Sequence, residues 1–228
     1  MEDDEKMELF IKAGPDKKSI GDCPFAHYVR MVIALKGVDC EVIPLPPDDK
    51  PDWLIEDFEG KMPVLDHKGM RTGESNAIAV TLDETFPDPP LRFHGKEETA
   101  MKALSGLFPA LAKVIKNPSL DFNSEKALLG QLSVANSYLI GKPKGDYILG
   151  EHISLADCSL TPKLYHLDVT LSHYYPDTRK KMDQFPQLKT YMAKMFESDA
   201  FKKTKYPPET LIWGWDTARG KTTGSCSI

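Results

Sequence analysis

The hydrophobic positions in the first part of the chain alternate between two periods. Residues 8–12 and 40–45 form short apolar runs rich in β-branched and aromatic side chains, which is typical of strands. Between them, residues 23–36 repeat apolar side chains at helical spacing, and Gly37 follows as a stop signal. The pattern predicts a strand, a helix and a second strand.

A second group of elements follows in the next forty or so residues. Residues 52–58 have the spacing of a short helix, residues 62–66 and 70–72 the pattern of two strands joined by a tight turn, and residues 74–86 that of another helix. The resulting order, βαβ followed by ββα, predicts an α/β N-terminal domain.

Closely spaced prolines then interrupt this pattern, because they cannot continue a helix and favour an extended linker. Beyond them the periodicity is helical throughout, which predicts an all-α C-terminal domain. We therefore expect a domain at residues 1–87, a linker at 88–95 and a second domain at 96–228. The expected helices of the second domain lie at residues 97–116, 124–140, 155–172 and 187–196.

Composition narrows the possible partners. The chain carries a net charge of −5 and is 41% hydrophobic, so it lacks the basic excess that nucleic-acid binding requires. No window reaches the roughly 18 consecutive apolar residues of a membrane-spanning helix. We expect no nucleic-acid partner and no stable membrane insertion. The acidic start does not resemble a signal peptide, so we expect a cytoplasmic protein, with an organellar form that has lost a transit peptide as the alternative.

The four cysteines, Cys23, Cys40, Cys158 and Cys226, form no C-x-x-C pair and no spacing with histidine that suggests a metal site. We therefore expect no bound metal and a reducing compartment. Cys23 stands out because Asp22 has the character of a helix N-cap and Pro24 that of a first helical residue. A cysteine in the first turn has its thiolate favoured by free backbone N–H groups. The alternative is a small buried side chain, and the local pattern leaves both readings open.

Two further segments are candidates for a ligand site near that cysteine. In a βαβ-ββα order, Pro63 would border Cys23, and the backbone of Val64 could pair with an extended peptide. At Gly73–Ser75 a helix begins, where Ser75 and free N–H groups could bind a carboxylate and Glu74 an ammonium group. The alternative for the second segment is an ordinary capped helix. Glutathione carries the groups that such a site would take.

The remaining motifs favour structural roles. Ser154 to Asp157 matches a capping box, and Cys158 would then lie in a helix core. His166 and His173 have no carboxylate pattern beside them that would indicate a metal site. We expect both histidines to be structural, and the tryptophans to be packing elements: Trp53, Trp213 and Trp215.

Several motifs together resemble the plant-type dehydroascorbate reductases, which are glutathione transferase relatives. The resemblance covers nearly the whole chain and rests on the segments FIKAG, GDCPF, DKPDW, GKMPVLD, ESNAI, FPDPPL and ISLADCSLTPKLYHLDV. It is more distant to omega-class glutathione transferases and chloride intracellular channel proteins, which share CPF. The resemblance implies the glutathione transferase fold, with a thioredoxin-like α/β N-terminal domain and an all-α C-terminal domain.

The resemblance also implies roles for individual residues. Cys23 matches the redox cysteine, and Lys12 and Asp22 match the residues that hold dehydroascorbate. The glutathione site is implied at Lys50, Pro63, Val64, Glu74 and Ser75, with Pro63 as a cis-proline. The chain departs from the family's usual CPFSQR at Ala26-His27-Tyr28, and Glu74 replaces the usual aspartate.

The implied activity is glutathione-dependent reduction of dehydroascorbate to ascorbate by a ping-pong mechanism through one cysteine. Glutathione would be a co-substrate, no cofactor would be bound permanently, and the protein would be a monomer. The alternatives are an omega-like thiol transferase that removes glutathione from protein disulfides, and a non-enzymatic relative, either channel-like or redox-sensing. Charged residues in the segment that a channel would insert, among them Arg30 and Lys36, argue against the channel.

Overall fold

A four-stranded sheet forms the centre of the N-terminal half in the computed structural model, which describes residues 6–93 and 95–220. The strands run in the order β2-β1-β3-β4. Strand β1 pairs in parallel with β2 and antiparallel with β3, and β4 is antiparallel to β3. Their bounds are β1 Met7–Lys12, β2 Glu41–Leu45, β3 Val64–His67 and β4 Met70–Gly73.

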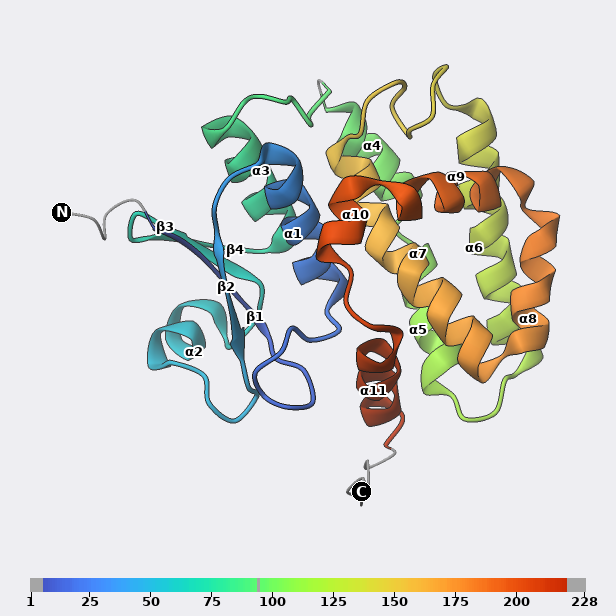
Figure 1. Cartoon of the computed structure of the whole chain (residues 1–228). Helices are drawn as coiled ribbons and strands as arrows, with labels where there is room; N and C mark the ends of the chain where they lie inside the picture. The colour runs from blue at the N-terminus through green and yellow to red at the C-terminus, as the bar shows by residue number, and fades with distance from the viewer. Residues whose placement is uncertain (1–5, 94, 221–228) are drawn as a thin grey trace.

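Three helices complete this half: α1 (Pro24–Lys36), α2 (Asp52–Phe58) and α3 (Ser75–Thr85). Helices α1 and α3 pack against each other, and α2 lies apart from them across the sheet (Figure 1). The predicted βαβ-ββα order is confirmed. Leu9, Ile11 and Leu65 from the strands and Val29 and Ile78 from the helices are buried together in the core, as the alternating pattern requires.

An ion pair inside the protein holds the proline-rich segment between the halves. Lys36 Nζ donates to Asp83 Oδ1 at 2.6 Å and to the carbonyl of Pro89 at 2.5 Å. The backbone N–H of Leu91 donates to the same carboxylate oxygen at 2.9 Å. The side chain of Lys36 has no exposed surface. The segment after α3 is thus fixed to α1 and α3 rather than free.

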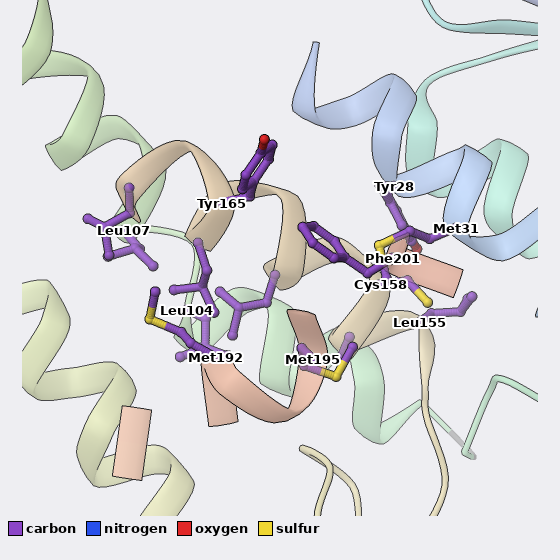
Figure 2. Packing of buried hydrophobic residues seen from close by; sticks show 14 of the residues in the cluster. Tyr28, Met31, Leu104, Leu107, Leu155, Cys158, Tyr165, Met192, Met195 and Phe201 are labelled. Carbon is purple, nitrogen blue, oxygen red and sulfur yellow. The ribbon is translucent and has the colours of Figure 1, made fainter. Parts of the chain in front are cut away.

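The C-terminal half is helical. Its central helix α7 (Leu155–Tyr174) packs against α1 and is surrounded by other helices (Figure 1). Figure 2 shows Cys158 of α7 packed near Tyr28 and Met31 of α1, which confirms its expected place in the core. The other helices are α4 (Lys96–Ala103), α5 (Leu107–Lys116), α6 (Phe122–Gly141), α8 (Pro176–Lys180), η2 (Lys181–Gln184), α9 (Pro186–Glu197), α10 (Asp199–Thr204) and α11 (Pro208–Ala218).

The start of α7 is the predicted capping box. Ser154 Oγ accepts from the backbone of Asp157, and the Asp157 carboxylate accepts from the backbone of Ser154. That buried carboxylate also accepts from the N–H of Ile148 and the hydroxyl of Tyr191. The box therefore ties α9 and the loop before α7 to the central helix.

The predicted helix at residues 97–116 is wrong in one respect, because two helices, α4 and α5, occupy this range. The chain turns at Gly106, where an added Cβ would lie 2.3 Å from Gln131 Oε1 of α6. A side chain at this position would have to displace the end of the Gln131 side chain. The short helices α8, α10 and α11 were not predicted, since a run of prolines and the mid-helix Gly214 weaken the periodic signal around them. No helix in the described part of the chain is long and apolar enough to cross a membrane.

Candidate functional site

The loop after β1 folds back and brings Cys23 beside its first strand. The N–H of Gly21 donates to the carbonyl of Lys12 at 2.9 Å. At Gly21 an added Cβ would lie 2.5 Å from that oxygen, so the close return requires glycine. Asp22 and Cys23 consequently lie next to the end of β1.

The prediction that Asp22 caps α1 is wrong. The N-cap is Cys23, with φ −72° and ψ 117°, and Pro24 is the first helical residue. The carboxylate of Asp22 instead accepts a hydrogen bond from Lys12 Nζ at 2.6 Å, with the carboxylate side chain 12% exposed and the lysine side chain 36%. A charged partner in a partly buried site competes successfully with neutral backbone donors. Lys12 and Asp22, which the resemblance implies for binding dehydroascorbate, are therefore in direct contact.

The Cys23 sulfur lies at the start of α1, where two opposing effects act on it. Hydrogen bonds from the backbone N–H groups of Ala26 and Phe25 and the nearby Lys12 ammonium favour the thiolate, while burial and the Asp22 charge disfavour it. Burial is the largest effect and raises the pKa of Cys23 above its ordinary value. The expected lowering of the pKa by the helix terminus is present but is outweighed. Cys23 is half-buried and unpaired with another cysteine.

A cavity of about 410 Å³ opens next to this helix start. Phe25, two residues after Cys23, lines it together with Pro63, and the Met62–Pro63 peptide bond is cis. The cavity thus joins α1 to the segment before β3, as the βαβ-ββα order suggested. The other lining residues are mostly polar: Asp57, Phe58, Glu59, Lys61, Met62, Gly73, Glu74 and Ser75.

The helix α3 begins at this cavity. Glu74 is its N-cap, with φ 61°, and among the described residues no side chain caps the helix there. The alternative of an ordinary side-chain cap is therefore excluded for this helix, and its first N–H groups stay available to an anion. Glu74 and Ser75 lie together at this end and line the cavity with one carboxylate and one hydroxyl.

Lys50 and Val64 lie further from the cavity. Lys50 Nζ donates to the carbonyl of Gly60 at 2.8 Å, between Glu59 and Lys61, which line the cavity. Val64 is fully buried, and its register pairs it with Phe10 of β1 and Gly73 of β4. Val64 is therefore enclosed within the sheet, and its neighbour Pro63 is the residue that lines the cavity.

The C-terminal helix α11 adds residues that the sequence did not indicate. The ring of Trp213 lies over Lys12, with Nζ 5.2 Å from the ring centroid. The next residue, Gly214, packs against the Asp22 carboxylate so closely that a Cβ would lie 1.8 Å from Oδ2. The expectation that Trp213 is a packing element is wrong, because the residue is half-exposed beside the Lys12–Asp22 pair.

A chain of buried hydrogen bonds connects α11 to the peptide before Cys23. Trp215 Nε1 donates to His166 Nδ1 at 3.0 Å, so the neutral imidazole carries its proton on Nε2. That nitrogen lies 2.8 Å from Tyr206 Oη, whose hydroxyl donates to the carbonyl of Asp22 at 3.0 Å. Burial lowers the pKa of His166 to about 3. His166 is structural as predicted, and its partner Tyr206 was not foreseen.

The segment Ala26-His27-Tyr28 faces the core. His27 is fully buried, and its Nε2 donates to Thr204 Oγ1 at 3.1 Å, since the Thr204 hydroxyl donates its own proton to Ala200. Burial also keeps the pKa of His27 well below its ordinary value. Of the residues at which the chain departs from its resemblance, His27 therefore joins α1 to α10, while the Tyr28 hydroxyl donates to Asn76 of α3. In the described ranges, 6–93 and 95–220, no group of three His, Cys, Asp or Glu side chains could hold a metal ion.

Comparisons with known proteins agree with this geometry. The family model of the glutathione S-transferase N-terminal domain matches residues 19–90, and that of the C-terminal domain matches residues 99–194. The chain is 32% identical to the chloroplastic glutathione S-transferase DHAR3 of Arabidopsis thaliana, over 92% of this chain and 79% of that protein. It is 34% identical to the probable cytosolic glutathione S-transferase DHAR1 of Oryza sativa subsp. japonica, over 92% and 96% of the two chains.

A solved structure gives the same result. The dehydroascorbate reductase of Chlamydomonas reinhardtii superposes with a TM-score of 0.79 at 28% identity, over 94% of this chain and 99% of the other. The glutathione transferase fold is therefore confirmed. The chain belongs to the glutathione S-transferase family, and the relatives named above are two DHAR glutathione S-transferases and one dehydroascorbate reductase.

Proposed function

We propose that this chain is a glutathione-dependent dehydroascorbate reductase that works through Cys23. The observation that carries the proposal is that the chain on either side of Cys23 belongs to two different sites, since Phe25 lines the cavity and Asp22 pairs with Lys12. The first site is the polar cavity at the start of α3. The second is the Lys12–Asp22 pair, whose charged atoms are 2.6 Å apart. One thiol can therefore meet a peptide thiol and an oxidised lactone in turn. The relatives named as dehydroascorbate reductases support the same activity.

The first half-reaction oxidises Cys23 and reduces dehydroascorbate. The thiol and one water molecule transfer two electrons and two protons to the lactone, which leaves as ascorbate, while the sulfur becomes a sulfenic acid. Lys12 stabilises the negative charge that develops on the ascorbate oxygens. Asp22 holds Lys12 in place and accepts a hydrogen bond from the substrate.

The second half-reaction restores the thiol. One glutathione condenses with the sulfenic acid, forming a mixed disulfide and releasing water. A second glutathione thiolate attacks this disulfide, so that glutathione disulfide leaves and the Cys23 thiolate returns. Glu74 binds the ammonium group of the first glutathione, and Ser75 with the α3 N–H groups binds a carboxylate. Pro63 and Val64 border the peptide, and Lys50 supports the wall from Gly60. Glutathione is thus a co-substrate.

The structure favours this function over the alternatives for specific reasons. An omega-like thiol transferase must admit a glutathionylated protein, yet α11 stands against Asp22 and Lys12 beside the sulfur. A channel would have to insert the segment that here forms α1 and β2, including the buried ion pair of Lys36. A redox-sensing protein without turnover would have the same cysteine, and measurable glutathione-dependent turnover would exclude it. We further propose that the protein is a monomer in the cytoplasm, with no permanently bound cofactor.

Glutathione-dependent formation of ascorbate, followed by its ultraviolet absorbance, tests the proposal. We expect turnover by the wild type, turnover at the same rate by Cys40→Ser, and none by Cys23→Ser. Cys40 is a suitable control because it lies beside β2, away from the cavity, and burial raises its pKa to about 12. Comparison with a glutathionylated peptide separates the reductase from the thiol transferase. Normal turnover by Cys23→Ser overturns the proposal.

A further inference from the structure

Helix α2 forms one wall of the cavity proposed for glutathione, and it is weakly anchored. Asp57 and Phe58 of this helix line the cavity, and Glu59 follows them. Of the seven residues of α2, all within the described part of the chain, Leu54 alone is buried. The helix lies across the sheet from α1 and α3 (Figure 1). Its position therefore depends on half-buried contacts at its surface.

Arg71 of β4 makes one of these contacts. The centre of its guanidinium group lies 3.9 Å from the ring centroid of Trp53, at the start of α2. Arg71 Nε also donates to Asp66 Oδ2 at 3.0 Å, and the two residues are paired across β3 and β4. Asp66 thus holds the guanidinium group at one edge while the indole lies against it. A planar guanidinium can bond along its edge and stack by its face at the same time, which a lysine ammonium cannot.

The ring of Trp53 connects Arg71 to the cavity wall. It packs edge-on against Phe10 of β1 and against Phe58, with ring centroids 5.0 Å and 6.2 Å apart. Phe58 in turn lies so close to the backbone of Gly73 that a Cβ added there would lie 2.7 Å from its ring. Phe58 and Gly73 both line the cavity, and Arg71 is not among the described residues that do. Arg71 therefore reaches the cavity only through Trp53 and Phe58.

This wall adjoins the residues proposed to bind glutathione. Gly73, which contacts Phe58, directly precedes Glu74 and Ser75 at the start of α3. The Lys12–Asp22 pair, proposed for dehydroascorbate, contacts α11 instead. A shift of α2 should therefore disturb the glutathione site and leave the other substrate's site intact.

We propose that Arg71 is a positioning residue for the glutathione site, which holds the α2 wall in place through the ring of Trp53. This inference rests on the proposed reductase function and concerns the half-reaction that uses glutathione. Arg71 touches neither substrate. Its loss lets α2 move away from Gly73, so the cavity no longer matches the peptide and glutathione binds less tightly.

Calorimetric titration of glutathione into the Cys23→Ser protein tests the inference without turnover. We expect Arg71→Ala to weaken binding about two- to tenfold, the size of one cation–π contact. Arg71→Lys, which keeps the cation without the planar stack, should recover part of the affinity. The matched control is Arg92→Ala, which removes an arginine of similar exposure, 34% against 36%, that pairs with Glu84. An unchanged affinity in Arg71→Ala, or an equal loss in Arg92→Ala, overturns the inference.

A double-mutant cycle with Trp53→Leu separates positioning from a general loss of stability. If Arg71 acts through the indole, Arg71→Ala should weaken glutathione binding much less when Trp53 is already replaced. The same fold-change in both backgrounds means that Arg71 does not act through Trp53, and it overturns the inference.

Turnover distinguishes the inference from the proposed function. In steady state, Arg71→Ala should raise the KM for glutathione and leave kcat and the KM for dehydroascorbate unchanged. A wild type without turnover whose Cys23→Ser form binds glutathione in an Arg71-dependent way overturns the reductase and leaves the positioning role. A wild type with turnover whose affinity for glutathione is indifferent to Arg71 overturns the positioning role alone.

Discussion

Lys12 Nζ lies 2.6 Å from Asp22 Oδ1, and these two charges have opposite effects on the neighbouring Cys23 thiol. Lys12 lowers the pKa of Cys23 and Asp22 raises it, although burial has the largest effect and raises it overall. The residue before the cysteine therefore does not activate the sulfur as a helix cap would. Its position favours a different role, holding Lys12 where the substrate is reduced.

Removing each charge should move the pKa of Cys23 in opposite directions. Asp22→Asn should lower the midpoint of the pH profile for iodoacetamide alkylation of Cys23, because a negative neighbour is lost. Lys12→Met should raise it, because a positive neighbour is lost while Asp22 remains. Mass spectrometry of the digested protein follows each cysteine separately.

The same digest contains an internal control. Cys40 has its own raised pKa, about 12, caused first by burial, and neither substitution should change its profile. In the wild type the Cys23 midpoint should lie above that of a cysteine in a short unstructured peptide. Shifts of Cys23 in the same direction for both variants would contradict this electrostatic account.

Gly214→Ala should impair the site more than the fold. The added Cβ would lie 1.8 Å from Asp22 Oδ2, so either α11 or the carboxylate must move. We expect kcat/KM for dehydroascorbate to fall by about tenfold or more, since misplacement of a positioning group by about 1 Å can cost a hundredfold. Gly130→Ala on α6 is the matched control, because a Cβ there meets nothing within 4 Å. Equal activity of the two variants would show that α11 does not position Asp22.

The buried Lys36–Asp83 pair should be important for stability. Lys36→Met removes the cation from a site without exposed surface and leaves the Asp83 carboxylate unpaired. Breaking a buried ion pair in this way costs about 3–5 kcal/mol of unfolding free energy. Urea denaturation measures the loss.

A second substitution should recover part of that loss. Asp83→Asn in the Lys36→Met background removes the unpaired charge and keeps an acceptor for the Leu91 N–H, which donates to Asp83 at 2.9 Å. Lys180→Met, which breaks the exposed pair with Asp177, should leave the urea midpoint unchanged. A double variant less stable than Lys36→Met would contradict the assignment of the loss to an unpaired charge.

His166 should make the protein less stable in mild acid. Its pKa is about 3 in the folded protein and 6.5 for an ordinary histidine. At a pH between these two pKa values, His166 therefore binds a proton in the unfolded chain but not in the folded protein. The free energy of unfolding that comes from a neutral His166 is fully present above pH 6.5, and it is lost as the pH falls toward 3.

Comparing wild type and His166→Gln over that interval isolates the effect. We expect the variant's free energy of unfolding to fall less steeply with decreasing pH, by up to about 1.4 kcal/mol per pH unit for one proton. The variant will be less stable at neutral pH because it loses a buried partner of Tyr206. That loss is the same at every pH, so it does not change the slope of the unfolding free energy against pH. Parallel curves would mean that His166 is already protonated in the folded protein.

The features that depend on local spacing along the chain were predicted correctly from the sequence. The βαβ-ββα order, the capping box at Ser154 and the core position of Cys158 were all readable from spacing and propensity. The same order of elements also predicted that Pro63 and Glu74 would lie near the start of α1, and both residues line one cavity with Phe25 of that helix.

What the sequence missed depends on contacts between distant segments. Asp22 is a residue type that often caps helices, but its carboxylate accepts a hydrogen bond from Lys12 instead. Gly214 weakens the helical signal of α11, although it is the residue that lets α11 approach Asp22. The contact of Trp213 with Lys12 and that of Tyr206 with the Asp22 carbonyl join residues about 200 and 184 positions apart. No local pattern encodes such pairs.

A single-turnover experiment without glutathione tests whether Cys23 is the reductant. In the proposed mechanism, Cys23 alone reduces dehydroascorbate before any glutathione reacts. Mixing excess dehydroascorbate with the reduced wild type should release one equivalent of ascorbate per protein chain and leave Cys23 oxidised in the mass spectrum. Cys23→Ser should release none. If the wild type forms no ascorbate until glutathione is added, the two-step mechanism through Cys23 is wrong.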